Sequence, residues 1–401
     1  MRIENLRKIK ENNIEKAVAT VIFEDNDRAP ADVYFHTSEE YNHFIGLNPD
    51  AFVLAAYTSA MFSGEKRIYI EGKIDENLKK GLLLNMKCFQ RWYGRKYKVI
   101  PIESSNIGIS QMNNPNRNTG AFFSGGIDSI YTLQNNRLKY SPDHPLHIKD
   151  CFIIHGFDMY WSSQHNKDIH IFERAVKRAR LITEETGTNL IPVFTNLRHH
   201  FYGDRGFWGS WHHGAALAAV SHCFTSRVKS IFIASSFSPS MIEPWGTHPL
   251  IDPNHSSSYL KVIHDDLCST IEKLELISTW ETAFQNIRSC YQNDETLLNC
   301  CHCEKCVRIM ITLMALGILD KSHAFPIHHI SPELLRNAIR EHRIERFFRG
   351  SYLQLVPFLK KHGYIDMANI VLQENKLKSK LRRLDQRYFH GKLKKLINIL
   401  R

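Results

Sequence analysis

Short apolar runs alternate along the middle of the chain with longer segments whose apolar residues recur at helical spacing. The apolar runs at 120–123, 151–154, 190–194 and 230–234 predict strands. The periodic segments that begin at 127, extend from 168 to 185 and extend from 213 to 223 predict helices. This alternation favours an α/β fold with a doubly wound parallel sheet.

Two further regions flank this α/β part. Alternating strand-like runs at 19–23 and 33–35 and helical runs at 52–61 and 81–88 predict a small α+β extension over residues 1–117. The α/β domain is then expected at 118–320, with a metal-binding insert at 290–306, and a helical extension at 321–401. The basic residues near its end are Lys376, Lys378, Lys380, Arg382, Arg383, Arg387, Lys392, Lys394, Lys395 and Arg401. Basic amphipathic helices of this kind can bind nucleic acid, an acidic partner or a membrane surface, and a solvated helix packed through its leucines is the alternative.

The junction between the first of these four strands and its helix carries Ser124-Gly125-Gly126-Ile127-Asp128-Ser129. Adjacent glycines let the backbone approach a ligand closely, and a helix N-terminus directs N–H groups at an anion. The pattern lacks the lysine of a Walker A loop, so it indicates a polyphosphate site of another type. An ordinary turn in which Asp128 or Ser129 caps the helix is the alternative.

The same six residues resemble the SGGxDS signature of the PP-loop ATP pyrophosphatase superfamily, whose members cleave ATP between the α and β phosphates. The resemblance implies ATP and Mg²⁺ as cofactors and makes Asp128 and Ser129 candidate catalytic residues. It also implies that Ser124, Gly125, Gly126 and Ser129 hold the leaving pyrophosphate, with Asp128 near the Mg²⁺.

Five of the nine cysteines lie between positions 290 and 306. Those with the spacing of a metal site are Cys290, Cys300, Cys303 and Cys306. Four thiolates complete the tetrahedral shell of Zn²⁺, which is typical of a structural site. A redox pair or a disulfide is the alternative, and a reducing cytosol disfavours a stable disulfide. Cys301 and His302 are not assigned as ligands.

A Ser-Cys-Tyr segment and a Cys-x-x-Cys-x-x-Cys segment, C-terminal to the glycine turn, together resemble the 7-cyano-7-deazaguanine synthase (QueC) family over residues 118–320. The resemblance implies the same four zinc ligands. It also matches Lys273-Leu274-Glu275 to a Lys-x-Glu triplet of the family, which makes Lys273 a candidate catalytic residue. A solvated charged helix face is the alternative for this triplet.

Residues that directly follow the parallel strands are further candidates, because ligands bind beyond the carboxyl ends of such strands. His155 and Gly156 follow the second strand and are assigned to ATP binding. The residues assigned to substrate binding are Arg198, Trp211, His212, Ser235 and Asp252. Arginine suits an oxyanion, aromatic rings suit a flat base, and a carboxylate suits the N–H groups of a guanine-like base. Ion pairing at the surface and local packing are the alternatives.

The resemblance implies carboxylate activation, in which pyrophosphate leaves ATP and an amine then displaces AMP from an acyl adenylate. Members with such extensions occur in bacterial antiphage defence operons, and that branch is thought to join a 7-deazaguanine to the N-terminus of a partner protein. Three functions remain open: this protein-modifying ligase, an ammonia-dependent synthase in queuosine synthesis, and a zinc-stabilised nucleotide-binding scaffold or tRNA-modifying protein whose basic tail contacts RNA.

The composition, 43% apolar and 23% charged, is that of a globular protein. The first residues lead into a mixed-charge stretch without the apolar run of a signal peptide, so a cytoplasmic location is expected. The apolar stretch at 309–319 is too short and too interrupted to span a bilayer, so no membrane span is expected.

Overall fold

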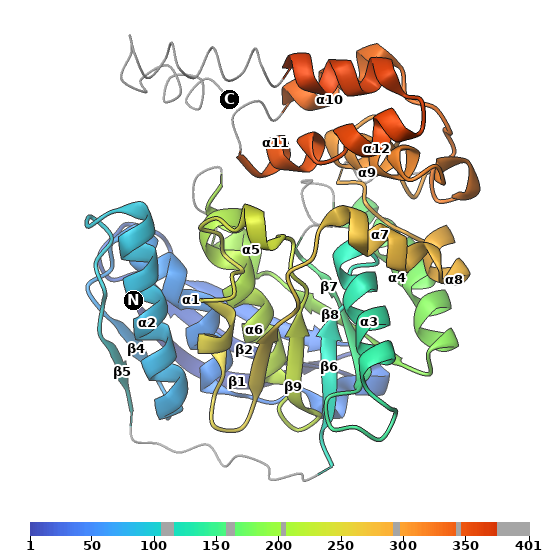
Figure 1. Cartoon of the computed structure of the whole chain (residues 1–401). Coiled ribbons are helices and arrows are strands. Elements are labelled where there is room, and N and C mark those ends of the chain that lie inside the picture. Colours follow the sequence, from blue (N-terminus) through green and yellow to red (C-terminus); the bar gives the residue numbers. More distant parts are fainter. Residues whose placement is uncertain (106–115, 158–164, 202–205, 292–296, 342–345, 375–401) are drawn as a thin grey trace. The chain divides into compact units, whose positions relative to one another are not determined.

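The computed structural model describes residues 1–105, 116–157, 165–201, 206–291, 297–341 and 346–374 (Figure 1). The chain divides into two compact units, of which the first holds residues 1–236 and 244–267 and the second holds 237–243 and 268–401. The predicted basic residues from Lys376 to Arg401 lie outside the described part of the chain.

The first unit contains one ten-stranded sheet with the strand order β10-β9-β6-β7-β8-β3-β2-β1-β4-β5. The β1–β2, β2–β3 and β3–β8 pairs are antiparallel, and the other pairs are parallel. The strands are β1 Arg2–Glu11, β2 Ile14–Ile22, β3 Ala31–Thr37, β4 Ile68–Ile70, β5 Ile102–Ser104, β6 Asn118–Phe122, β7 Ile148–His155, β8 Asn189–Thr195, β9 Val228–Ile233 and β10 Lys261–His264.

The N-terminal extension does not form a separate sheet. Its strand β3 pairs with β8, with Phe35 opposite Thr195, so the predicted boundary at residue 117 falls within one continuous sheet. The pairing has a physical reason, because it satisfies the backbone N–H and C=O groups that β8 would otherwise expose as an edge strand. The strands β2 and β3 and the helices α1 (Pro49–Ser63) and α2 (Glu76–Tyr93) lie where runs were predicted, but they belong to a unit that extends to residue 236.

Helices cover both faces of the central strands. They are α1 Pro49–Ser63, α2 Glu76–Tyr93, α3 Ile127–Lys139, α4 His165–Glu185, α5 Leu197–His200 and α6 His213–Cys223, with short helical turns η1 Glu39–Phe44, η2 Trp208–His212 and η4 Asp252–His255. Phe152 and Ile154 belong to the core that contains α1 and α6. The alternate residues Cys151 and Ile153 are buried on the opposite face, where α3 and α4 contact the strands.

The four predicted strands and three predicted helices of the α/β part correspond to β6–β9 and to α3, α4 and α6. From β6 the sheet grows through β7 and β8 in one direction, whereas β9 lies on the other side of β6. Strand β6 is therefore the topological switch point, where ligands of open α/β sheets bind beyond the carboxyl ends of the strands.

The second unit is helical. Its elements are η3 Pro239–Met241, α7 Thr270–Ser278, α8 Glu281–Gln285, α9 Glu304–Ala315, η5 Leu319–Lys321, α10 Pro332–Glu341, α11 Arg346–Leu353 and α12 Val356–Lys361. The buried helix α9 contacts α7, α10 and α12. Because α10 and α12 complete the packing around α9, the predicted boundary at residue 320 does not separate two units, and the division falls between Leu267 and Cys268.

Candidate functional site

The glycine turn connects the end of β6 to the start of α3. Gly125 has φ 73°, a left-handed conformation that favours glycine, and Gly126 occupies the N-cap position without a side-chain capping bond. The Gly126 N–H donates to Ser124 Oγ at 3.3 Å, and Ser129 Oγ donates to the Gly126 carbonyl at 2.9 Å. Two hydroxyls and the first N–H groups of α3 therefore gather at one turn, as anion binding requires.

Asp128 connects this turn to the neighbouring strand β9. Ser236, which follows β9, donates from its hydroxyl to Asp128 Oδ2 at 3.1 Å. Ser236 is exposed, and Asp128 is half-buried. The contact places a carboxylate at the switch point, beside the hydroxyls of Ser124 and Ser129. Carboxylate oxygens at such a position are suitable ligands for Mg²⁺.

Two of the assigned residues pack tightly at the ends of β7 and β8. Gly156 has φ 101°, and a Cβ atom there would lie 1.9 Å from the Thr195 carbonyl oxygen, so only glycine fits. The half-buried His155 ring packs against Phe172 and Phe194, with centroid distances of 5.2 and 5.6 Å. The close packing of Gly156 on Thr195 therefore explains why this position is glycine, and no bound ligand is needed to explain it.

Arg198 lies at the carboxyl edge of β8, in α5. Its Nη1 donates to the Phe157 carbonyl at 2.8 Å, and its guanidinium stacks over the Trp208 ring, 4.7 Å from the centroid. The stacking fixes the orientation of a cation at the edge where ligands bind. Ser235 lies at the same edge, after β9, but it is buried, unlike its neighbour Ser236.

Trp211 and His212 lie in the aromatic core rather than at this edge. Trp211 packs on Phe89 and Tyr93, with centroids 4.9 and 4.5 Å away. His212 is fully buried, and its Nδ1 lies 2.6 Å from Thr58 Oγ1. Burial lowers the pKa of His212 to about 3, so the ring is neutral. Packing accounts for both residues, whereas sequence reasoning had singled them out for substrate.

Asp252 is fully buried in η4. Its Oδ2 accepts from His264 Nδ1 at 2.7 Å, and its Oδ1 accepts from the His248 N–H at 3.4 Å. If Asp252 formed hydrogen bonds with a purine-like base, as predicted, the base would have to displace His264 or the His248 N–H. His264 was not among the candidates predicted from sequence, because nothing in the segment 261–264 indicates that it pairs with a carboxylate twelve residues earlier.

Lys273 lies in the second unit, in α7. The helix begins with a capping box, in which Ser269 Oγ accepts from the Glu272 N–H and the Glu272 side chain accepts from the Ser269 N–H. The Lys273 side chain is among the largest fully buried ones. The solvated face that was the alternative for this triplet is therefore not observed for Lys273, whereas Glu275 is exposed. Lysine is rarely buried without a partner.

The four predicted cysteines form a buried cluster in the second unit. The sulfur atoms of Cys290, Cys300, Cys303 and Cys306 all lie within 4.8 Å of one another. Four thiolates around a tetrahedral Zn²⁺ would be separated by about 3.8 Å, because Zn–S bonds are about 2.3 Å long. The cluster could therefore bind a metal such as zinc.

Asn299, which sequence reasoning missed, organises this metal loop. Its Oδ1 accepts from the N–H groups of Ser289 and Cys290 at 2.8 and 3.1 Å. Its Nδ2 donates to the carbonyls of Ile287 and Ala324, both at 2.8 Å. The fully buried amide thus joins the segment before Cys290 to the segment before Cys300. In the sequence, only its position directly before Cys300 and Cys301 associates Asn299 with the metal loop.

Comparison with protein-family models, with curated proteins and with solved structures finds no match. No helix among the described residues is long and apolar enough to cross a membrane.

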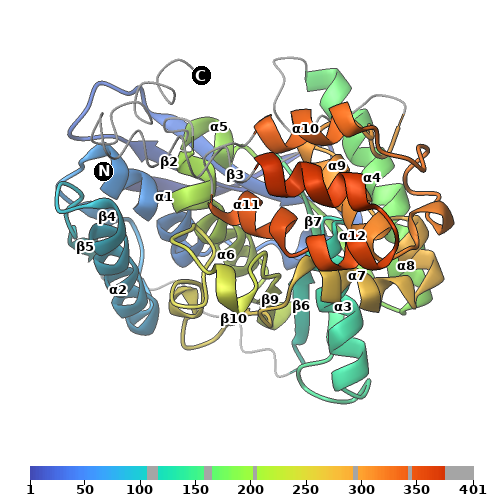
Figure 2. The ribbon, with the colours of Figure 1, turned by 45° about the horizontal axis from the view of Figure 1, so that its top comes forward.

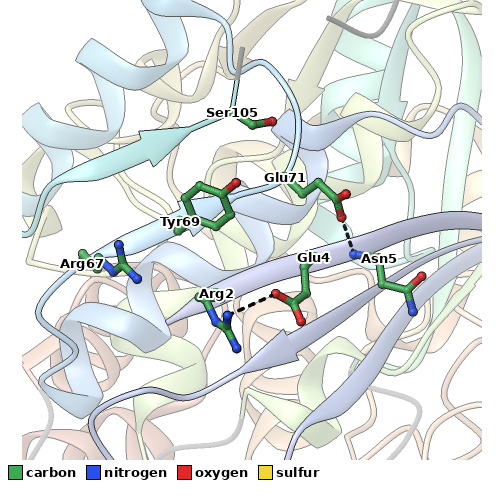
Figure 3. A pocket seen from close by; sticks show the side chains of 7 residues that line it. All are labelled: Arg2, Glu4, Asn5, Arg67, Tyr69, Glu71 and Ser105. Carbon is green, nitrogen blue, oxygen red and sulfur yellow. Dashed lines mark hydrogen bonds and ion pairs between the residues drawn. The ribbon is translucent and has the colours of Figure 1, made fainter. Parts of the chain in front are cut away.

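A separate hollow of about 660 Å³ lies over β1 and β4 (Figure 3). Its lining residues are Arg2, Glu4, Asn5, Arg67, Tyr69, Glu71 and Ser105. Arg2 pairs with Glu4 at 3.7 Å, the Asn5 N–H donates to Glu71 at 2.6 Å, and Arg67 pairs with Glu24 and Glu103 at 3.0 and 2.9 Å. These contacts compensate the charges within the hollow, which therefore indicates no particular ligand.

Proposed function

We propose that this chain is an ATP-dependent ligase that adenylates the carboxylate of a 7-deazaguanine-type substrate and transfers the acyl group to the N-terminal amine of a partner protein. The observation that carries the proposal is the Ser124–Ser129 turn, with its left-handed Gly125, at the switch point of a ten-stranded α/β sheet. The PP-loop resemblance of this turn supplies the ATP chemistry.

The donors of the turn support pyrophosphate as the bound group. The exposed Ser124 hydroxyl, the Ser129 hydroxyl and the N–H groups at the start of α3 converge there. Asp128, oriented by Ser236, would hold the Mg²⁺, which offsets phosphate charge when bound. The reaction requires no protein nucleophile, so positioning and charge stabilisation account for catalysis.

Arg198 supports an anionic substrate at the neighbouring edge. Its stacking on Trp208 and its bond to the Phe157 carbonyl leave a planar cation with a fixed orientation. A guanidinium binds carboxylates through paired N–H groups, which suits a substrate that presents a carboxylate for activation.

The cysteine cluster supports the narrower resemblance to 7-deazaguanine chemistry. It follows the glycine turn in the sequence, as in that family, and its four buried sulfur atoms are arranged for a closed structural metal site. The proposal that the acceptor is a protein rests on the resemblance to the antiphage-defence branch. Free ammonia is the alternative acceptor.

Pyrophosphate release tests the proposal. With ATP, Mg²⁺ and 7-carboxy-7-deazaguanine, we expect Ser124→Ala or Asp128→Ala to lower pyrophosphate release by about a hundredfold or more, because each removes a group that stabilises transition-state charge. Ser141→Ala, two residues beyond the C-terminal end of α3, is the control and should keep the wild-type rate. Unchanged thermal unfolding of all three variants would show that the fold is intact.

The products distinguish the acceptors. Mass spectrometry of a coexpressed partner protein should show an added deazapurine acyl group on its N-terminus. A free nitrile as the sole product would instead favour the ammonia-dependent synthase. Wild-type protein that releases no pyrophosphate would overturn the ligase proposal and leave the nucleotide-binding scaffold.

A further inference from the structure

A buried carboxylate–imidazole pair ends strand β10. His264 is the last residue of this strand, and its side chain is only 4% exposed. Its Nδ1 lies 2.7 Å from Oδ2 of Asp252, which is completely buried in η4. Other buried histidines of the first unit that the structure describes bond to a hydroxyl, a carbonyl or a backbone N–H, as His212, His222, His255 and His248 do.

The carboxylate determines which nitrogen of His264 carries the proton. Nδ1 must donate to Asp252, so Nε2 of the neutral ring is a hydrogen-bond acceptor. This Nε2 is buried and has no hydrogen-bond partner in the described part of the chain, which is equally true of Nε2 of His212 and of His222. His264 differs from these two histidines because its other ring nitrogen pairs with a carboxylate, the arrangement that stabilises an imidazolium.

The surrounding elements hold the pair rigidly. Asp252 Oδ1 accepts from the His248 N–H, and a Cβ atom at Gly214 would lie 3.1 Å from the same oxygen. The Asp252 main chain is fixed by its own N–H, which donates to the His248 carbonyl at 3.0 Å. The titratable groups around the pair include His213, His248 and Tyr57.

The pair also lies at the edge of the sheet that carries the candidate site. Strand β10 lies beside the parallel strand β9, with His264 opposite Ile233 (Figure 2). Ile233 precedes Ser235 by two residues. Strand β9 in turn pairs in parallel with β6, which leads into the Ser124 turn. The carboxyl ends of β10, β9 and β6 therefore face the same side, where ligands of such sheets bind.

We propose that His264 is the general base of the acyl-transfer step, with Asp252 as its positioning residue. This inference rests on the proposed function. The nitrogen of the free amine forms a bond to the acyl carbon, the acyl C–O bond breaks, and AMP leaves with the electron pair. The N–H proton that the amine loses moves to Nε2 of His264, and Asp252 stabilises the resulting imidazolium.

The experiment separates the two half-reactions in the full-length protein. The probes are 7-carboxy-7-deazaguanine as acyl donor and a short peptide with a free N-terminal glycine as acceptor. Exchange of labelled pyrophosphate into ATP reports adenylation, and peptide mass reports transfer. We expect His264→Gln to keep the exchange rate within about twofold and to slow transfer about a hundredfold, since general bases contribute roughly 10²–10⁴-fold.

Two further variants distinguish catalysis from stability. Asp252→Asn should also slow transfer selectively, because an amide favours the wrong tautomer of His264. The matched control is His222→Gln, in which a buried histidine bound to a carbonyl is changed at the C-terminal end of α6. It should leave both half-reactions unchanged.

The outcomes test the inference separately from the proposed function. Absence of pyrophosphate exchange in wild type would overturn both. Normal exchange in wild type, with His264→Gln retaining the wild-type transfer rate, would overturn the role of His264 alone. Equal loss of exchange and transfer in His264→Gln would also overturn it, since the pair would then be merely structural.

Discussion

At the scale of single residues, two glycines next to candidate nucleotide sites have different explanations. Gly125 has φ 73° in a turn that gathers hydroxyl and N–H donors. Gly156 has φ 101° and packs so closely on the Thr195 carbonyl that no side chain fits. Sequence alone assigned both to ATP, because a glycine after a strand has the same pattern in either case. Both glycines have positive φ, so only their contacts separate the two explanations.

Gly156→Ala should lower the free energy of unfolding by more than 3 kcal/mol, because left-handed strain of about 1–3 kcal/mol adds to a backbone clash. Gly187→Ala is the matched control: it has φ 65° with open space around its Cα, so only about 1–2 kcal/mol of strain is expected. Urea unfolding measures both. Equal losses in the two variants would contradict the steric explanation.

At the scale of elements, the metal loop shows which features of a site a sequence reveals. The spacing of cysteines predicted the four clustered residues, since the chain must bring closely spaced ligands together. The same spacing could not reveal Asn299, whose partners Ile287 and Ala324 are distant in sequence. Likewise, the Asp252–His264 pair depends on η4 packing against β10, which no local pattern predicts.

Asn299→Ala should accelerate loss of bound zinc to a chelator by about 10–100-fold, because supporting hydrogen bonds around metal ligands have effects of this size. Cys301→Ser is the control within the same loop. Its thiol is buried but lies outside the clustered set, so zinc retention should be unchanged. Atomic emission after timed dialysis gives the metal content, and retention of zinc by Asn299→Ala at the wild-type rate would contradict the assigned role.

At the scale of the whole molecule, the sequence predicted the alternation of strands and helices from β6 to β9 but not how the flanking regions join it. The first residues read as a separate α+β unit because their strands alternate in burial, which is equally true of strands that extend a larger sheet. Long-range pairing such as β3 with β8 leaves no local signature. The division of the chain into two units could therefore be established only from the structure.

Buried neutral histidines make the first unit sensitive to acid. Burial lowers the pKa of His212 and His255 to about 3 and that of His222 to about 4, from 6.5. Below pH 6.5 the unfolded chain binds protons that the folded chain does not, so stability falls as pH falls. Burial raises the pKa of Asp50 to about 6, which acts in the opposite direction between pH 6 and 4.

Burial also lowers the pKa of His36 and His248 to about 4 and raises the pKa of Asp252. Five histidines outweigh two aspartates, so the free energy of unfolding should fall by roughly 4 kcal/mol per pH unit near pH 5, at about 1.4 kcal/mol per group. Urea unfolding between pH 7.5 and 5 tests this. His255→Gln should reduce the slope by about a quarter to a third, since one of the five histidines is removed. A stability that is constant over this range would contradict the neutral state of the buried rings.

The most direct test of the central claim is pyrophosphate–ATP exchange that depends on a 7-deazaguanine carboxylate. The account predicts exchange in wild type only when the carboxylate is present, and none above background in Asp128→Ala, whose fold should be unchanged. Exchange that persists in Asp128→Ala would show that the turn between β6 and α3 is not the nucleotide site. Exchange in wild type without any carboxylate would equally contradict the proposed activation step.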